Sequence, residues 1–507
     1  MRKLSSKEIV EKVLKANNFS SLNPVQKEAL KLGVLERKNL VVSSPTSSGK
    51  TLIAELAGLN TTLNFNQKMV YLCPLVALAR EKYEDFKKKY ENLKIKVALS
   101  VGNYDSSDPW LQNFDWIITS NEKFDSLIRH EASWISEIGL IVADEIHLLD
   151  DFSRGPTLEI LLTLLKRILP KSQFLAFSAT IKNAEEIANW LRAFVLKSNF
   201  RPVPLYRGIV FKDKIELFDF KTYELRKDLA LEEAILENTL LMKKQMIFFL
   251  SSRRNAEALA ERLSRLTFHF LEDEEIKKLE KISKKIENVL ETPTEQCKKL
   301  ATCVKNGTAF YHSGLLFKQR ILVEEAYKEG LIKAICSTTS LAFGINLPNF
   351  RAVVRDIKRY YPGLGSVFLP VLEVEQMFGR SGRPKYDSWG EGILIAKTEK
   401  DKKELTKIYI LGELEEISSK LDKIIYYLKI SQENTLKNKI KSVLGHSKLR
   451  KKIYELCEGK HTVKDIASVL GKSIQHISIE LSRMEKEGIV RIDKVGRRRF
   501  YIKIMEV

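Results

Sequence analysis

The chain has 507 residues, enough for roughly three domains of ordinary size. Hydrophobic residues make up 44% and charged residues 30%, a composition typical of globular proteins that excludes a disordered chain. The 85 Lys and Arg residues exceed the 65 Asp and Glu residues by 20. Such an excess favours a polyanionic partner, nucleic acid before an acidic membrane surface, although a charge-rich thermophile-like surface gives the same balance.

Several further classes are excluded. The sequence holds no apolar run of 18 residues, which predicts no transmembrane helix and no membrane partner. The first 18 residues are charged throughout and lack the apolar core of a signal peptide. The five cysteines are odd in number and form no C-x-x-C pair, which argues against a disulfide scaffold or a zinc site and favours a cytoplasmic location.

Short apolar runs alternate with amphipathic stretches between about residues 20 and 200. The runs are residues 39–43, 68–73, 116–119, 140–143 and 173–177. This alternation predicts βαβ units and a parallel sheet. The pattern restarts after residue 207, with runs at 246–250, 309–311, 333–336 and 392–396. The sequence therefore predicts an α/β fold with two tandem domains, joined near residues 200–207, where two prolines interrupt the pattern.

The rest of the chain is mostly helical. Residues 257–304 are charged and sheetless, which indicates a helical insertion in the second domain, and residues 408–444 are helical as well. Residues 448–504 show two short helices, a longer one over 473–487 and two strands around 495–499, the order of a winged helix-turn-helix. The predicted boundaries are residues 1–206 and 207–400 for the α/β domains, and 401–507 for the helical linker and winged helix.

A phosphate-binding loop is the first chemical motif. Residues 44–51 read S-P-T-S-S-G-K-T between a strand and a helix, which is the Walker A layout with Ser44 in place of the first glycine. We expect Lys50 to reach the β- and γ-phosphates of ATP and the Thr51 hydroxyl to bind Mg²⁺. Backbone N–H groups of the loop should cradle the phosphates, at Thr46, Ser47, Ser48 and Gly49. The alternative is a plain Ser/Gly turn.

Two acids at the end of a later apolar run complete the motif. Residues 144–147 read D-E-I-H. We expect Asp144 to hold Mg²⁺ and Glu145 to orient and polarise the attacking water. His147 is either structural or, as we favour, a link between the ATP site and the bound strand. The acids alone could cap a helix, but the phosphate loop 95 residues earlier argues against that.

The second predicted domain carries a pair of arginines. Residues 376–384 read Q-M-F-G-R-S-G-R-P, with Arg380 and Arg383 three residues apart. Two guanidinium groups at this spacing can face one phosphate cluster when two domains close over it, as arginine fingers do. The alternative is a surface turn held by salt bridges.

In this order the motifs resemble those of superfamily 2 DExH-box helicases, within them the Ski-type branch, and most of all archaeal HelQ-like DNA helicases. The resemblance runs from about residue 19 to 421. Its motifs fall at residues 19–26 (Q), 44–51 (I), 73–83 (Ia), 119–127 (Ib), 144–147 (II), 178–180 (III), 249–254 (IV), 312–314 (IVa), 337–348 (V) and 376–384 (VI). It adds Gln26, as the reader of adenine, together with Gly344 and Gln376 to the ATP site.

The resemblance implies two tandem RecA-like P-loop domains with parallel sheets, followed by a winged helix. It also implies a monomeric, ATP- and Mg²⁺-dependent hydrolase that moves 3′ to 5′ on single strands and unwinds duplexes in DNA repair or recombination. Full-length HelQ-like enzymes continue into a helical ratchet domain. Since this sequence stops at Val507, we expect that domain to be missing, with a weaker grip on the strand.

Nucleic acid is expected along both α/β domains, held mainly by its backbone. By resemblance, the path is lined by Pro74, Arg80, Thr119, Glu122, Arg253 and Thr338. Residues 359–368 form a predicted hairpin in which Tyr360, Tyr361 and Phe368 could stack on the last base pair of a duplex, although a surface loop is the alternative. Arg497, Arg498 and Arg499 at a predicted wing tip could meet duplex phosphates; otherwise they are solvated surface.

Three functions remain open at this point. We favour a DNA helicase acting on single-stranded and forked substrates; RNA is the alternative strand, and protein partners are not identified. A second possibility is a nucleic-acid-stimulated ATPase that remodels protein–nucleic-acid complexes with little unwinding. The third is a winged-helix DNA binder with an inactive ATPase core, against which the intact Lys50, Asp144, Glu145, Arg380 and Arg383 argue.

Overall fold

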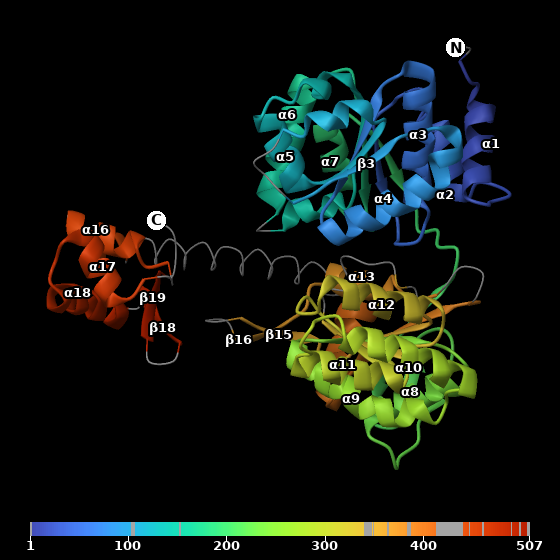
Figure 1. Cartoon of the computed structure of the whole chain (residues 1–507). Helices are drawn as coiled ribbons and strands as arrows, with labels where there is room; N and C mark the ends of the chain where they lie inside the picture. The colour runs from blue at the N-terminus through green and yellow to red at the C-terminus, as the bar shows by residue number, and fades with distance from the viewer. Residues whose placement is uncertain are drawn as a thin grey trace. The chain divides into compact units, whose positions relative to one another are not determined.

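The computed structural model describes residues 3–102, 107–151, 154–338, 347, 349–361, 365–382, 387–411, 440–445, 447–458, 461–487, 489–495 and 498–503. The chain divides into two compact units, residues 1–415 and 416–507 (Figure 1). The first unit contains two α/β domains, each built on one large sheet, and the second contains a winged helix.

The first sheet has seven strands, all parallel, in the order β3-β4-β2-β5-β6-β1-β7. They are β1 (Leu40–Ser43), β2 (Lys68–Cys73), β3 (Val97–Ser100), β4 (Trp116–Ser120), β5 (Ile138–Ala143), β6 (Gln173–Ser178) and β7 (Phe194–Lys197). Because neighbouring strands run the same way, their carboxyl ends meet at one edge of the sheet, where open α/β sheets place ligands.

Helices cover both faces of this sheet (Figure 1). One face packs against α1 (Ser6–Ala16), α2 (Pro24–Lys31), α3 (Lys50–Phe65) and α4 (Val76–Tyr90), and the other against α5 (Asn121–Arg129), α6 (Gly155–Ile168) and α7 (Ala184–Leu191). Leu40 and Val42 of β1 lie in the first core, and Val41 lies in the second. Since a strand buried on both faces needs apolar side chains at every position, β1 is a continuous apolar run. Short 3-10 helices lie at Glu91–Leu93, Pro109–Asn113, Ser133–Glu137 and Ile146–Asp150.

The second sheet has eight strands in the order β10-β9-β8-β17-β14-β11-β13-β12. They are β8 (Leu205–Phe211), β9 (Lys214–Leu217), β10 (Thr222–Glu224), β11 (Met246–Leu250), β12 (Thr308–Tyr311), β13 (Ala334–Thr338), β14 (Arg351–Val354) and β17 (Gly390–Ile395). The strands β8, β17, β14, β11, β13 and β12 pair in parallel, whereas β9 pairs antiparallel with both β8 and β10, so β9 departs from the expected parallel arrangement at this edge. Only two residues join β8 to β9, and a two-residue connection permits only an antiparallel pair.

The helices of the second domain are α8 (Leu231–Leu241), α9 (Arg253–Phe268), α10 (Asp273–Glu287), α11 (Glu295–Lys305), α12 (Phe317–Lys328), α13 (Val371–Phe378) and α14 (Glu399–Leu405). Residues 257–304, the expected insertion, lie in α9, α10 and α11. Leu263 of α9, Leu279 of α10 and Leu300 of α11 all belong to the main core of the domain. The segment is therefore part of the domain core and not an appendage. A five-residue π-helix, Thr406–Ile410, follows α14.

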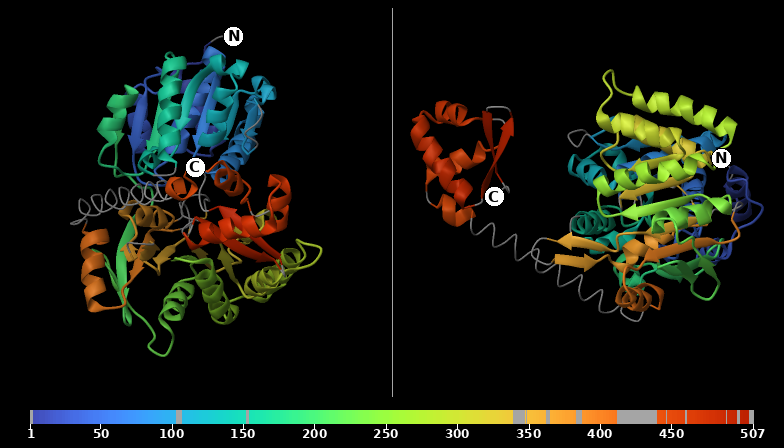
Figure 2. Two further views of the ribbon diagram at one scale, coloured as in Figure 1. Left: turned by 90° about the vertical axis from the view of Figure 1, so that its left-hand side faces the viewer. Right: turned by 90° about the horizontal axis from the view of Figure 1, so that it is seen from below.

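A two-stranded hairpin extends from the second domain (Figures 1 and 2). It consists of β15 (Lys358–Tyr361) and β16 (Gly365–Phe368), which pair antiparallel with Lys358 opposite Phe368 and Tyr360 opposite Ser366. The hairpin expected at residues 359–368 is therefore confirmed, apart from its tip at 362–364, which lies outside the described residues.

The second unit has its own small core. It contains α16 (Lys448–Glu455), α17 (Val463–Leu470), α18 (Ile474–Lys486) and the antiparallel strands β18 (Val490–Val495) and β19 (Arg498–Lys503), the arrangement of a winged helix. The three helices share one hydrophobic core, to which they contribute Ile453, Ile466 and Leu481. Most of the helix expected at 408–444 lies outside the described residues. Among the residues that are described, no helix combines the length and apolar character needed to span a membrane.

Candidate functional site

The phosphate loop lies at the carboxyl end of β1 and leads directly into α3. Gly49 caps α3 with a φ of +87°, and Ser47 has a φ of +65°. Both values lie in the left-handed region, which costs little only for glycine. A Cβ at position 49 would also overlap the side-chain amide of Gln26, so glycine is required there for two reasons. The tight loop turns its backbone toward the amino end of α3, where N–H groups can bind an anion.

Lys50 and Thr51 occupy the first turn of α3. Lys50 Nζ donates hydrogen bonds to the carbonyl oxygens of Ser44 (2.6 Å) and Pro45 (3.0 Å), so its ammonium lies over the loop. Burial lowers the pKa of Lys50, while the charges of Glu145 and Asp144 act in the opposite direction. These two carboxylates therefore help to keep the buried lysine charged.

Two side chains of the Q-motif region donate hydrogen bonds to the backbone of the phosphate loop. Gln26 Nε2 donates to the carbonyl of Gly49 (3.2 Å), and Asn23 Nδ2 donates to the carbonyl of Ser48 (2.8 Å). Gln26 and Asn23 also cap α2 through a reciprocal capping box. We predicted only Gln26. Asn23 was missed because an Asn at a helix start is explained by capping alone.

Asp144 and Glu145 lie at the carboxyl end of β5, next to the loop. Tyr71 Oη donates a hydrogen bond to Asp144 Oδ2 (2.7 Å), and Tyr71 is fully buried. Burial, followed by the neighbouring Glu145, raises the pKa of Asp144, and this hydrogen bond opposes the rise. Asp144 and the Thr51 hydroxyl provide the oxygen ligands that Mg²⁺ prefers. Tyr71 was missed by the sequence analysis, although a buried tyrosine hydroxyl normally needs a partner.

His147 joins the D-E-I-H motif to the second domain. Gln376 Nε2 lies 2.6 Å from His147 Nε2. This hydrogen bond joins the imidazole to the amide of motif VI, and the other ring nitrogen of His147 is Nδ1. That nitrogen is 3.3 Å from Glu145 Oε2 and 3.4 Å from Ser178 Oγ. His147 thus connects motifs II, III and VI.

The ionisation of His147 makes the folding stability of the protein depend on pH. Burial, followed by the charge of Lys50, lowers the pKa of His147 from 6.5 to about 4. The unfolded chain therefore binds this proton more tightly, and stability is lost as pH falls from about 6.5 toward 4. Between pH 7 and 4.5, we expect the free energy of unfolding to fall by about 2–3 kcal/mol more in the wild type than in a His147→Gln variant. Denaturant unfolding at the two pH values measures this difference. An equal loss in both proteins would contradict the lowered pKa.

Motif VI approaches the phosphate loop from the end of α13. A Cβ on Gly379 would overlap the Thr46 hydroxyl, so the two domains meet at this glycine. Arg380 follows directly. Burial lowers the pKa of its guanidinium, and the carboxylates of Glu81 and Glu145 oppose that effect. The charge of the predicted catalytic acid thus acts on the predicted finger arginine. Arg383 and Gly344 lie outside the described residues.

The predicted strand contacts lie near the carboxyl ends of several strands. Thr338 ends β13 and is half-buried, as is Glu122 in the first turn of α5. Arg80 is exposed and its guanidinium carbon lies 5.4 Å from the ring centroid of Phe317. Arg253 is also exposed.

Two of these predicted contacts are buried. The Thr119 side chain has no exposed surface, and its hydroxyl donates to the Ser120 carbonyl (3.3 Å). Pro74, just after β2, is buried as well. Neither side chain can touch a strand in this conformation. The side chains at positions 74 and 119 are thus buried, whereas those of Arg80 and Arg253 are exposed to solvent.

The structure describes only some of the predicted nucleic-acid contacts in the β15–β16 hairpin and in the β18–β19 wing. The side chain of Tyr360 is 72% exposed, and Phe368 on the same face packs under Lys358, whose Nζ lies 4.5 Å from its ring centroid. The side chain of Tyr361 is not described, nor are those of Arg498 and Arg499 in β19. Arg497 lies outside the described residues.

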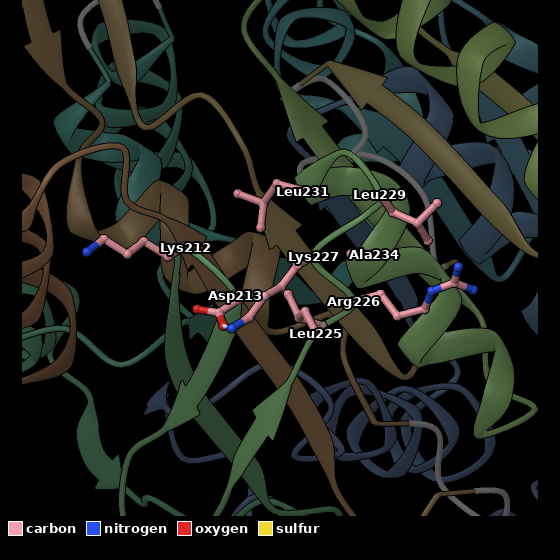
Figure 3. Close-up of a pocket in the computed structure, with 8 residues that line it drawn as sticks. All are labelled: Lys212, Asp213, Leu225, Arg226, Lys227, Leu229, Leu231 and Ala234. Atoms are coloured by element: carbon pink, nitrogen blue, oxygen red, sulfur yellow. Dashed lines mark ion pairs between the residues drawn. The ribbon is translucent and has the colours of Figure 1, made fainter.

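A separate pocket of about 370 Å³ lies in the second domain (Figure 3). It is lined by Lys212, Asp213, Leu225, Arg226, Lys227, Leu229, Leu231 and Ala234. Lys227 pairs with Asp213 (3.2 Å), and Arg226 pairs with Asp228 and Glu237. Because Arg226 and Lys227 are paired with neighbouring acids and none of the motif residues lines it, we do not assign this pocket to the nucleotide.

The phosphate loop and the paired acids lie at the carboxyl ends of β1 and β5, where open α/β sheets place ligands. Residues 23–187 match the family model of DEAD/DEAH box helicases. The match covers the phosphate loop, the D-E-I-H motif and the S-A-T motif, the parts that the structure brings together at one edge of the first sheet.

The chain is similar to several archaeal proteins named ATP-dependent DNA helicase Hel308. The protein from Pyrococcus horikoshii is 43% identical over 414 residues, which are 82% of this chain and 56% of that protein. The protein from Methanococcus vannielii is 42% identical over 417 residues (80% and 54%), and that from Pyrococcus abyssi 39% over 458 residues (90% and 61%). The chain thus spans somewhat more than half the length of these curated relatives.

Proposed function

We propose that this protein is an ATP-driven DNA helicase of the archaeal HelQ-like group, in the Ski-type branch, that translocates 3′ to 5′ on single strands. The observation that carries the proposal is the direct contact of His147 with Gln376, because it joins the acids of the ATP site to the domain that carries the arginine finger. Similarity to proteins named ATP-dependent DNA helicase over more than four fifths of the chain supports the same function.

Each group of the site has a role in ATP hydrolysis. Lys50 binds the β- and γ-phosphates, Glu145 orients and polarises the attacking water, and Arg380 stabilises the charge that develops on the transferred phosphoryl group. Thr51 and Asp144 would hold Mg²⁺, whose charge, when bound, neutralises phosphate oxygens. The geometry favours hydrolysis that depends on the approach of the two domains, because the arginine and the acid come from different sheets.

The names of the similar proteins and the net positive charge of the chain bear on the substrate of the proposed enzyme, and its cysteines bear on its cellular location. The names of the relatives favour DNA, and the formal excess of 20 positive charges suits a polyanion. We propose that a monomer acts on single-stranded and forked DNA in repair or recombination. A reducing, cytoplasmic setting is supported by the five cysteines, all of them free and buried.

The proposal is tested by ATP turnover with matched DNA and RNA single strands. We expect DNA to stimulate turnover strongly and RNA to stimulate it weakly. Equal or stronger activation by RNA would point to an RNA helicase. Activation by DNA without any strand separation would indicate a remodelling ATPase, and no turnover at all would contradict an active motor.

The hairpin of β15 and β16 should act in duplex opening. Two variants test this role: one replaces residues 361–366 by a two-residue turn, and the other replaces Tyr360 by Ala. Both should keep strand-stimulated ATP turnover. Both should slow unwinding by about fivefold or more, because one base–aromatic stack contributes about 1–3 kcal/mol. A gel-based unwinding assay measures both variants. Phe194→Ala, which removes another exposed aromatic ring from β7, is the matched control. Wild-type unwinding rates in both hairpin variants would make this hairpin a structural element only.

A further inference from the structure

Lys82 of α4 points at the phosphate site. Its Nζ donates a hydrogen bond to Thr51 Oγ1 at 2.8 Å. Thr51 is the residue whose hydroxyl is expected to bind Mg²⁺, so a lysine ammonium contacts the same oxygen that the metal would use. Lys82 lies within the motif Ia segment, residues 73–83, but the resemblance assigned it no role. On an amphipathic helix near the surface, a lysine is ordinarily a solvated residue.

The charge of Lys82 acts on the same groups as a metal ion would. It favours the ionised form of Asp144 and so lowers the pKa of that carboxyl, against the larger effects of burial and of Glu145. It also disfavours the ammonium of Lys50. The charges of two cationic side chains, Lys50 at the start of α3 and Lys82 from α4, therefore act on Asp144.

An ammonium and Mg²⁺ cannot share the Thr51 hydroxyl. Mg²⁺ binds its oxygen ligands at about 2.1 Å and requires nearly ideal octahedral geometry. A second cation 2.8 Å from the same oxygen would lie within a few ångströms of the metal, and two positive charges at that distance repel strongly in a partly buried site. The two cations must therefore exclude each other from Thr51.

We propose that Lys82 is a positioning residue that serves as a resident cation of the phosphate site and is displaced from Thr51 by Mg²⁺ when nucleotide binds. This inference rests on the proposed ATPase function. Lys82 holds the Thr51 hydroxyl and neutralises the acidic pair until the metal replaces it. Its displacement opposes metal binding, so Lys82 raises the Mg²⁺ concentration that nucleotide binding requires.

The test is a Mg²⁺ titration of the binding of a fluorescent, non-hydrolysable ATP analogue to the full chain. Lys82→Met removes the competing charge and should lower the Mg²⁺ concentration at half-maximal binding by roughly fivefold, the factor for a unit-charge interaction in a well-screened site. Lys82→Gln retains a hydrogen-bond donor but no charge, and should behave like Lys82→Met. Lys82→Arg retains the cation and should keep the wild-type midpoint.

Two further measurements separate this role from a structural one. Lys88→Met, on the exposed part of the same helix, is the matched control and should keep the wild-type midpoint. In EDTA, Lys82→Met should melt at a lower temperature than wild type, because the acidic pair loses a counter-charge, and Mg²⁺ with nucleotide should reduce that difference.

The outcomes distinguish this inference from the function on which it rests. Normal nucleotide binding with an unchanged or raised Mg²⁺ midpoint in folded Lys82→Met and Lys82→Gln would overturn the resident-cation role alone. A wild-type protein that binds no nucleotide at any Mg²⁺ concentration would overturn the ATPase proposal together with it.

Discussion

Replacing Glu145 by Gln is expected to lower ATP turnover at least ~100-fold while ATP binding survives, the usual scale for the loss of a general base. Glu145 directly follows the predicted metal ligand, with a φ of +53°, and its Oε2 lies 3.3 Å from the ring nitrogen of His147. Glutamine keeps the size and most hydrogen bonds of this side chain but cannot accept a proton from water. Turnover is measured by phosphate release and binding by a fluorescent nucleotide.

The matched control is Glu159→Gln, which makes the same change at an exposed position of α6 and should leave turnover unchanged. Near-normal turnover in Glu145→Gln would remove Glu145 from the role of water activation. A collapse of ATP binding instead would mean that the acid serves mainly to keep Lys50 charged.

Replacing Arg380 by Ala should cost about 10³-fold in turnover, the lower end of the effect of an arginine finger. Arg380 follows Gly379, which meets Thr46 of the phosphate loop, and the charges of Glu81 and Glu145 raise the pKa of its guanidinium against the larger effect of burial. Removing it takes away the positive charge that balances the transferring phosphoryl group. Binding of single-stranded DNA should remain nearly intact, because we assign this guanidinium to the nucleotide site and not to the path of the strand.

Arg265→Ala on the exposed face of α9 is the control for loss of one positive charge in the same domain. If Arg380→Ala lost its affinity for single strands and kept its turnover, the residue would be a strand contact. Fluorescence anisotropy with a labelled oligonucleotide, run beside the turnover assay, separates these outcomes.

Several buried parallel strands could be predicted from the sequence because most of their positions are apolar. β2, β5, β6 and β11 all show this pattern, and each was expected within two residues of its observed bounds. Six strands were missed, namely β3, β7, β8, β9, β10 and β14, of which β14 is a central, buried strand that is only four residues long and begins with Arg351. β7 exposes Phe194 and Lys197, and β9 and β10 alternate exposed and buried positions over three or four residues, too short a stretch to stand out from a loop.

The site was predictable where function requires a fixed local spacing, and not elsewhere. The phosphate loop and the D-E-I-H motif are contiguous in the sequence, so Lys50, Thr51 and Asp144 could be assigned before the fold was known. Tyr71 and Lys82 reach the same site from other elements, and their partners lie 73 and 31 residues away. Lys82 lies within the motif Ia segment, but the local sequence does not reveal either contact, since both depend on which strands and helices become neighbours.

Strand separation driven by ATP tests the account most directly. The measurement is unwinding of a duplex with a single-stranded 3′ tail, compared with the same duplex bearing a 5′ tail. We predict that wild type unwinds the 3′-tailed substrate with ATP and Mg²⁺, that it leaves the 5′-tailed one paired, and that Glu145→Gln unwinds neither. Robust DNA-stimulated ATP turnover without separation of the 3′-tailed duplex would contradict a helicase.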